Sequence, residues 1–193
     1  MSKSDPAASK KERNKTIRWV IIIFFVTLFI SGTISFVSDE TMERSNIVVA
    51  FLILLAIVLL GIVSDLIGLA VTSADEKPFH SMAARKVPGA MDAIRLLRNA
   101  ERVSSICNDV VGDICGVVSG SASATIAAQV LQNFEFSMPD IVTLLLSALV
   151  AALTVSGKAI GKTLALNSST KIVAGVGRVI YTLRQIPLLF KKK

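Results

Sequence analysis

The sequence predicts an all-α fold: a polytopic helical membrane protein with about four transmembrane helices and amphipathic juxtamembrane helices. The first observation is composition, because 52% of the 193 residues are hydrophobic and only 18% are charged. In soluble domains, about 45–50% of the residues are apolar and about 25% are charged. The second observation is distribution, because the apolar residues form long runs that charged connectors separate. The apolar content excludes a disordered chain, and a count of two cysteines excludes a disulfide scaffold.

The first element follows a basic tail. Residues 1–18 hold six Lys or Arg and two acids without apolar periodicity, so we expect a solvated tail. Trp19 to Val37 then contains no charge, and about 20 apolar residues span a bilayer core. This run is too long for the apolar part of a secretory signal, and no A-x-A motif follows it. We therefore expect a retained transmembrane helix over residues 19–37.

Three further spans alternate with connectors. The second and fourth are strongly apolar, whereas the third is rich in Gly, Ser and Ala. Their expected limits are Ile47 to about Val71, residues 105–131 and Ile141–Val155. The charged connector at about 74–104 contains a short amphipathic helix from Ala90 to Ala100, with apolar residues on one face and arginines on the other.

The last segment, residues 156–193, has eight Lys or Arg and no acid. Its apolar residues recur at helical spacing, and Lys171, Arg178 and Arg184 lie off their face. The apolar set is Ile172, Val173, Val176, Val179, Ile180 and Leu183. This pattern is typical of a helix that lies in the membrane interface, and it argues against a fifth span.

The charges predict the orientation. The two tails and the 74–104 connector hold twenty of the 21 basic residues, whereas loops 38–46 and 132–140 hold one basic residue and five acids. Because basic residues near span ends stay in the cytoplasm, we expect a multi-pass protein of the cell membrane with both termini cytoplasmic. The net charge of +7 therefore records orientation. It does not indicate nucleic-acid binding, which needs a clustered basic face with base-reading groups.

Three acids fall inside the expected spans: Asp65, Asp109 and Asp113. A charge at the bilayer centre costs about 2.5–3.5 kcal/mol on insertion scales, so it usually has a use. Hard divalent cations take carboxylate, amide and hydroxyl oxygens, which these acids, Ser64 and Asn108 supply. Alternatively, the acids lie nearer the interface or bond neighbouring helices. No nucleophile–base set or catalytic motif is present, so we do not expect an enzyme.

The third span also carries small or short residues at four-residue intervals, which lets helices approach closely. The series is Asn108, Gly112, Gly116, Gly120, Ala124 and Ala128. We expect a tight packing seam along this face.

Four segments, in order, resemble the membrane domain of the CorB/CorC and cyclin M magnesium transporter family. The segment from Val155 to Asn167 resembles F-G-E-I-I-P-K-T-L-A-x-x-N, and Arg95–Arg102 resembles L-L-x-N-P-E-R. Ile106–Asp113 corresponds to an Asn-containing polar motif, and the stretch from Ser64 to Asp75 resembles S-G-L/A…G-L…L-D. The resemblance covers residues 47–185. Residues 19–37 are then an additional helix and residues 186–193 a basic tail.

The resemblance implies three spans with a juxtamembrane helical belt, a homodimer, and Mg²⁺ held between the helices. Carried over, the magnesium positions are Ser64, Asn108, Gly112 or Asp113, and Gly157. The family's regulatory CBS pair and C-terminal domain have no counterpart in these 193 residues, so we expect a stand-alone core.

The chain departs from the family at three positions. Lys158 replaces the family Glu, Gly161 replaces the Pro, and Gly112 replaces the second Asn. A lysine beside a cation site opposes binding unless it points away, whereas the three membrane acids restore negative charge. We therefore predict transport of magnesium or another divalent cation. The alternative, favoured by Lys158, is a membrane scaffold or partner subunit in which an internal ammonium–carboxylate pair has replaced the ion.

Overall fold

The protein is described by a computed structural model that covers residues 6–133 and 138–190. All elements of these residues are helices, which confirms the all-α fold. The helices are α1 (Pro6–Glu43), α2 (Ile47–Ser73), α3 (Lys77–Ala84), α4 (Ala90–Arg98), α5 (Ala100–Ser105), the π-helix η1 (Ile106–Gly112), α6 (Asp113–Asn133) and α7 (Pro139–Phe190). Parts of the expected tails and of the 132–140 loop (1–5, 134–137 and 191–193) lie outside the described residues.

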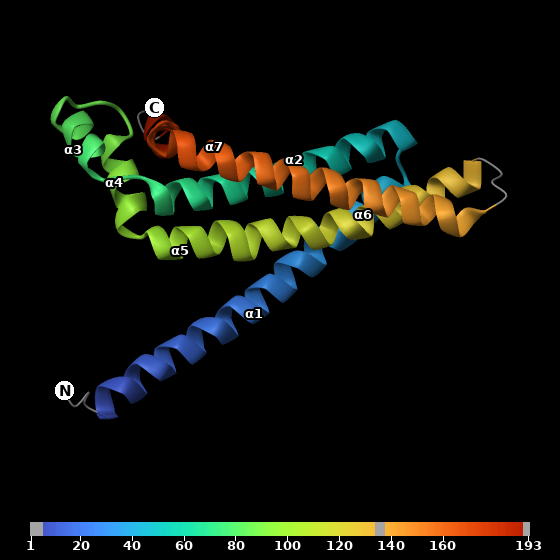
Figure 1. The fold of residues 1–193 in the computed structure, drawn as a ribbon, viewed down its shortest axis with the longest axis horizontal. Coiled ribbons are helices and arrows are strands. Elements are labelled where there is room, and N and C mark those ends of the chain that lie inside the picture. Colours follow the sequence, from blue (N-terminus) through green and yellow to red (C-terminus); the bar gives the residue numbers. More distant parts are fainter. Residues whose placement is uncertain (1–5, 134–137, 191–193) are drawn as a thin grey trace.

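Four helical segments are long and apolar enough to cross a membrane, as the sequence predicts: Ile17–Met42, Ile47–Ser73, Ala100–Asn133 and Pro139–Ile186. In Figure 1, α1 and α6 run in one direction, and α2 and α7 run in the other. The short helices α3 and α4 lie at the end of the molecule where both ends of the chain are found (Figure 1). The described residues therefore form a helical bundle of the kind that is embedded in a membrane, with four candidate spans.

Helix α1 is longer than predicted and diverges from the bundle (Figure 1). It begins at Pro6, so residues 6–18 of the expected tail are helical. A proline is well tolerated in the first turn, where its missing N–H has no intrahelical partner to lose. Most large apolar side chains of α1 are exposed, as expected of a helix surrounded by lipid. Its firm attachment is near its C-terminal end, where Ser121 Oγ donates to Asp39 (3.0 and 2.7 Å) and Gln129 Nε2 donates to the Met42 carbonyl (2.6 Å).

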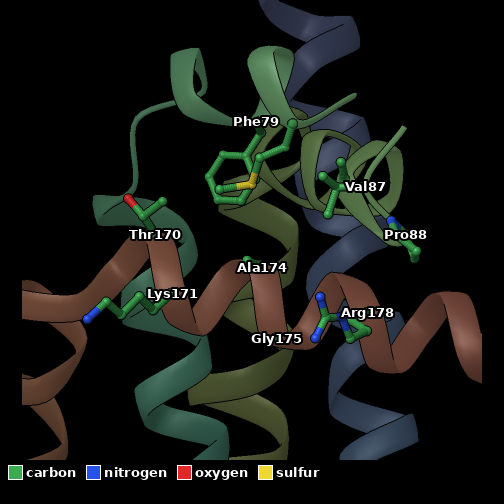
Figure 2. Close-up of a pocket in the computed structure, with 10 residues that line it drawn as sticks. Phe79, Val87, Pro88, Thr170, Lys171, Ala174, Gly175 and Arg178 are labelled. Carbon is green, nitrogen blue, oxygen red and sulfur yellow. The ribbon is translucent and has the colours of Figure 1, made fainter. Parts of the chain in front are cut away.

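Helix α7 joins the predicted fourth span and the predicted interfacial helix into one element of 52 residues. A straight helix of that length would measure about 78 Å, whereas the hydrocarbon core is about 30 Å thick. The helix is interrupted at Ser168, whose backbone (φ −132°, ψ 24°) is not helical. The helix therefore continues past Val155, the expected end of the fourth span, and its axis is interrupted at Ser168. The segment beyond it lies across the ends of the other helices (Figure 2).

Two apolar clusters hold the bundle together, one toward each end. The first joins all four spans through Met42, Ala50, Leu54, Val58, Ala122, Ile126 and Val150. The second joins the span ends to α3, α4 and α7 through Ala70, Val71, Phe79, Ala93, Ile94, Ala165 and Val173. Along α2 the fully buried members of the clusters stop at Val58 and resume at Ala70, about 18 Å apart, and only partly buried apolar residues such as Ile62 and Leu66 pack against the clusters in between. The polar residues of α2 lie in this gap.

Candidate functional site

A π-helix interrupts the third span where the sequence places its polar motif. The segment η1 runs from Ile106 to Gly112, directly before α6. A π-helix widens the helix by one residue per turn, is rare, and is frequent at functional sites. The four-residue series nevertheless continues through it, because Asn108 and Gly112 both lie against α2.

Ser64 fixes the π-helix to α2. Its hydroxyl donates a hydrogen bond of 2.8 Å to the backbone carbonyl of Cys107. Ser64 is buried, and it lies about 13 Å before the end of α2. The hydroxyl is thus inside the bundle, not at its rim. Its donated bond fixes its proton, and its lone pairs remain free to accept.

Asn108 lies against Gly68 of α2. Its amide nitrogen donates to Ser104 Oγ (3.2 Å), while its carbonyl oxygen Oδ1 is buried and has no hydrogen-bond partner in the described residues. A Cβ at Gly68 would overlap Asn108 Oδ1, so glycine is what lets the amide approach α2. A buried polar oxygen without a partner costs about 1–3 kcal/mol. Such an oxygen is suited to accept a donor or a cation.

Asp65 and Lys158 meet over Gly112. From the Cβ position of Gly112, Asp65 Oδ1 lies at 3.7 Å and Lys158 Nζ at 3.8 Å. The two side chains do not form a direct ion pair among those found in the described residues. Both are half-buried, and Gly112 is buried. We call Ser64, Asp65, Asn108, Gly112 and Lys158 the polar cluster.

The structure does not bring every predicted site residue into this cluster. Asp109 and Asp113 are exposed, and Asp109 Oδ2 accepts a hydrogen bond from Ser105 Oγ (2.8 Å). Gly157 lies against Ile62 of α2, because a Cβ there would overlap the Ile62 side chain. Gly157 therefore allows α7 to approach α2, one residue before Lys158.

The small-residue series is likewise divided between two environments. Gly112 faces the polar cluster, whereas Gly116 and Gly120 are exposed, and a Cβ on either would have nothing within 4 Å. Within the chain, α6 buries a neighbouring face against the bundle. Its buried residues are Ile114, Cys115, Val118, Ser119, Ala122, Ser123, Ile126 and Ala127. Within the described residues, the seam expected along the series is thus used at Asn108 and Gly112 but not at Gly116 and Gly120.

The polar cluster offers oxygens of several kinds from two helices, but one strong anion. In the described residues, no three His, Cys, Asp or Glu side chains are grouped so that they could hold a metal ion. A divalent ion here would depend on Asp65, the Asn108 amide oxygen and the Ser64 hydroxyl, which are acceptable ligands for Mg²⁺. Gly68 and Lys158 were missing from the set proposed from the sequence. Gly68 is recognisable as the residue one turn after Ser64 on the same face of α2.

Comparisons of the chain with protein families, curated proteins and solved structures find no match. The resemblance to the CorB/CorC and cyclin M family, and the magnesium positions that it implies, stay predictions.

Proposed function

We propose that this membrane protein transports magnesium or another divalent cation, with the ion held in the polar cluster during passage. The single observation that carries this proposal is the buried Asn108 Oδ1, which lies within a span and has no hydrogen-bond partner in the described residues. Natural proteins rarely leave such an oxygen unpaired without a use. A cation that is bound by Asn108, Asp65 and Ser64 would satisfy the amide oxygen and neutralise the carboxylate. The cation is the substrate, and no catalysed reaction is involved.

Lys158 has a specific role in this mechanism. With no divalent ion present, its ammonium group partly neutralises Asp65 across Gly112. An arriving divalent cation takes its place, and the flexible lysine side chain moves away from the carboxylate. Because a charge inside the bilayer is costly unless it is compensated, this exchange keeps Asp65 compensated at each stage. Release then requires a change in helix packing that returns Lys158 to Asp65.

The second candidate is a membrane scaffold or partner subunit derived from the same architecture. The observation that favours it is the same proximity of Lys158 Nζ and Asp65 Oδ1 to Gly112. In that case the lysine is a permanent structural counter-ion, and the cluster holds α2, η1 and α7 together without binding a metal.

One titration separates the two. The purified protein is heated in detergent at increasing MgCl₂, and the midpoint of unfolding is recorded. A ligand of the folded state adds about 2.7 kcal/mol to the free energy of unfolding at 100 times its Kd. We expect this stabilisation in the unchanged protein and its loss in Asp65→Asn. The matched control, Asp113→Asn, removes an outward-facing carboxylate of the third span and should respond like the unchanged protein.

Lys158→Met gives the sharper result. If the lysine competes with the cation, the substitution should tighten magnesium binding at least tenfold, because a unit charge about 4 Å away is worth about 4 kcal/mol at an effective dielectric constant of about 20. If the lysine is a permanent counter-ion, the substitution destabilises the protein and no divalent cation restores it. Absence of stabilisation by any divalent cation in both proteins would reject transport.

The orientation and assembly belong to the same proposal. We place the protein in the cell membrane with both termini and the α3–α4 connector in the cytoplasm, because these segments carry nearly all the basic residues. A homodimer is the expected assembly. The exposed glycines Gly116 and Gly120 support it, because they would let a helix of a second copy approach α6 closely.

A further inference from the structure

A cavity separate from the polar cluster lies at the end of the bundle that carries the short helices. It has a volume of about 310 Å³ and lies between α3, the loop before α4, and α7 beyond its kink. Figure 2 shows its apolar wall, in which Phe79 of α3 faces Ala174 of α7, with Val87 beside it. Met82 of α3 lines the same cavity. Phe79 is completely buried. We call this cavity the belt pocket.

The belt pocket is kept open by the way α7 is fastened beside it. A Cβ at Gly89, whose φ is +85°, would lie 2.5 Å from Arg178 N, and one at Gly177 would lie 2.6 Å from the Gly89 carbonyl oxygen. The two backbones are thus in direct contact. Gly175 lies about one turn before Arg178 on α7. It has nothing within 4 Å of its Cβ position, and it lines the pocket. The pocket is therefore a fixed gap between rigid elements.

Two cations frame the apolar wall. Lys171 and Arg178 both line the pocket and are both exposed. They are seven residues apart, which places them on one face of α7 about 10 Å from each other. In Figure 2 the Lys171 side chain extends away from Arg178, at the other end of the pocket. Neither belongs to an ion pair among the described residues.

The nearest acids are already occupied by other partners. Asp92 of α4 accepts from Arg95 (3.0 Å) and Arg184 (3.3 Å). Glu76, just before α3, is paired with His80 (3.0 Å) and Arg98 (3.1 Å). The positive charge of the rim is thus not compensated from α3 or α4, and it attracts an anion.

The occupant has to combine an apolar part with an anionic head. The pocket lies where α2 ends at Ser73 and α7 kinks at Ser168, which is the level at which spans leave the hydrocarbon and phosphate groups begin. A bilayer supplies such a molecule at this depth. Basic pockets between helices at this level bind anionic phospholipid head groups.

We propose that the belt pocket is a binding site for an anionic phospholipid. The phosphate group lies at the rim between Lys171 and Arg178, and an acyl chain covers the accessible part of the apolar wall, which is Met82, Val87 and Ala174. The lipid joins α3 to the end of α7, so its binding fastens the juxtamembrane helices to the membrane surface. The proposal does not depend on cation transport, since it uses none of the polar cluster.

The test measures lipid retention by the full chain. Purified protein in detergent is mixed with phosphatidylglycerol or phosphatidylcholine, and bound lipid is counted by native mass spectrometry. We expect preferential retention of phosphatidylglycerol. Arg178→Gln and Lys171→Gln should each weaken it about fivefold, which corresponds to about 1 kcal/mol for each basic residue near an anionic surface. The matched control, Arg102→Gln, removes an exposed charge of α5 at the same end and should have no effect.

Filling the cavity tests the part of the proposal that concerns the acyl chain. Gly175→Leu adds a side chain into open space without a steric conflict at Cβ, so the fold is preserved while the pocket is occupied. We expect at least a tenfold loss of phosphatidylglycerol retention and an undiminished unfolding temperature in lipid-free detergent. Equal retention of the two lipids, or retention unaffected by both Arg178→Gln and Gly175→Leu, would overturn the proposal. Equal stabilisation by glycerol phosphate would overturn it too, because an acyl chain would then be unnecessary.

Discussion

The polar cluster and the belt pocket are both built where α7 passes a glycine, yet the two close approaches differ. In the polar cluster, the Cβ position of Gly112 has the Cys107 carbonyl oxygen of the same π-helix at 3.3 Å. The atoms that other helices bring to it are side-chain atoms, Asp65 Oδ1 at 3.7 Å and Lys158 Nζ at 3.8 Å. Next to the belt pocket, the Cβ position of Gly89 lies 2.5 Å from Arg178 N and 2.6 Å from Arg178 Cα. Gly112 makes room for side chains of two other helices, which can move, whereas Gly89 makes room for the backbone of α7.

This difference teaches which region can change shape. Side chains such as Lys158 reorient at the cost of a rotamer, whereas two helix backbones in contact can only separate as a whole. The polar cluster is therefore suited to exchange one cation for another. The surroundings of the belt pocket are suited to stay fixed. The following substitutions test this contrast, from the largest expected effect to the smallest.

Gly89→Ala should have the largest effect. The new Cβ would overlap the backbone of Arg178, and the residue would also keep a φ of +85°. Overpacking costs about 1–3 kcal/mol and an unfavourable backbone region about 1–3 kcal/mol. We expect the free energy of unfolding to fall by about 2–6 kcal/mol, measured by thermal unfolding in detergent.

Gly175→Ala is the matched control for Gly89→Ala, because it adds the same methyl group on α7 where nothing lies within 4 Å. It should leave stability unchanged or raise it by up to about 1 kcal/mol through helix propensity. If Gly89→Ala were as harmless as Gly175→Ala, the rigid contact between the two backbones would be refuted.

Gly68→Ala should have an intermediate effect. Its Cβ would overlap Asn108 Oδ1, a side-chain atom, which must turn away. We expect a loss of about 1–3 kcal/mol in the same unfolding assay, together with weaker magnesium stabilisation. A double substitution, Gly68→Ala with Asn108→Ala, removes the overlap and should recover part of the stability. A purely additive loss would show that the two residues do not meet.

Ser64→Ala should have the smallest effect. It removes the 2.8 Å hydrogen bond to the Cys107 carbonyl without adding volume. A typical intramolecular hydrogen bond contributes about 0.5–1.5 kcal/mol, and we expect a loss in that range. Amide hydrogen exchange should increase in η1 but not in α4. Equal increases in both helices would indicate that the two regions are coupled instead of independent.

The spans could be predicted from the sequence because hydrocarbon imposes a length and a composition on any helix that crosses it. The kink at Ser168 could not, since the apolar pattern of residues 141–190 continues on both sides of it. The helix from Pro6 was also missed, because a basic, polar stretch has no apolar face to reveal its period.

The candidate site was predicted in part for a similar reason. Ser64, Asp65, Asn108 and Gly112 come together as expected from their depth in the spans. Asp109 and Asp113 do not join them, because each follows a residue of the cluster by one position and is exposed on another face of the third span. A π-helix has no sequence signature of its own. Lys158 stood out in the sequence as a departure from a family pattern, but only the fold places it beside Gly112.

The attachment of α1 also bears on how the protein is made. Asp39 and Met42 are held by Ser121 and Gln129, which follow them by 82 and 87 residues. At about 5–20 residues per second, the ribosome needs roughly 4–16 s to produce these partners. During that interval α1 must stay in the bilayer unaided, and its uncharged run of nineteen residues from Trp19 to Val37 makes this possible. The first helix is thus an early anchor that the third span secures later.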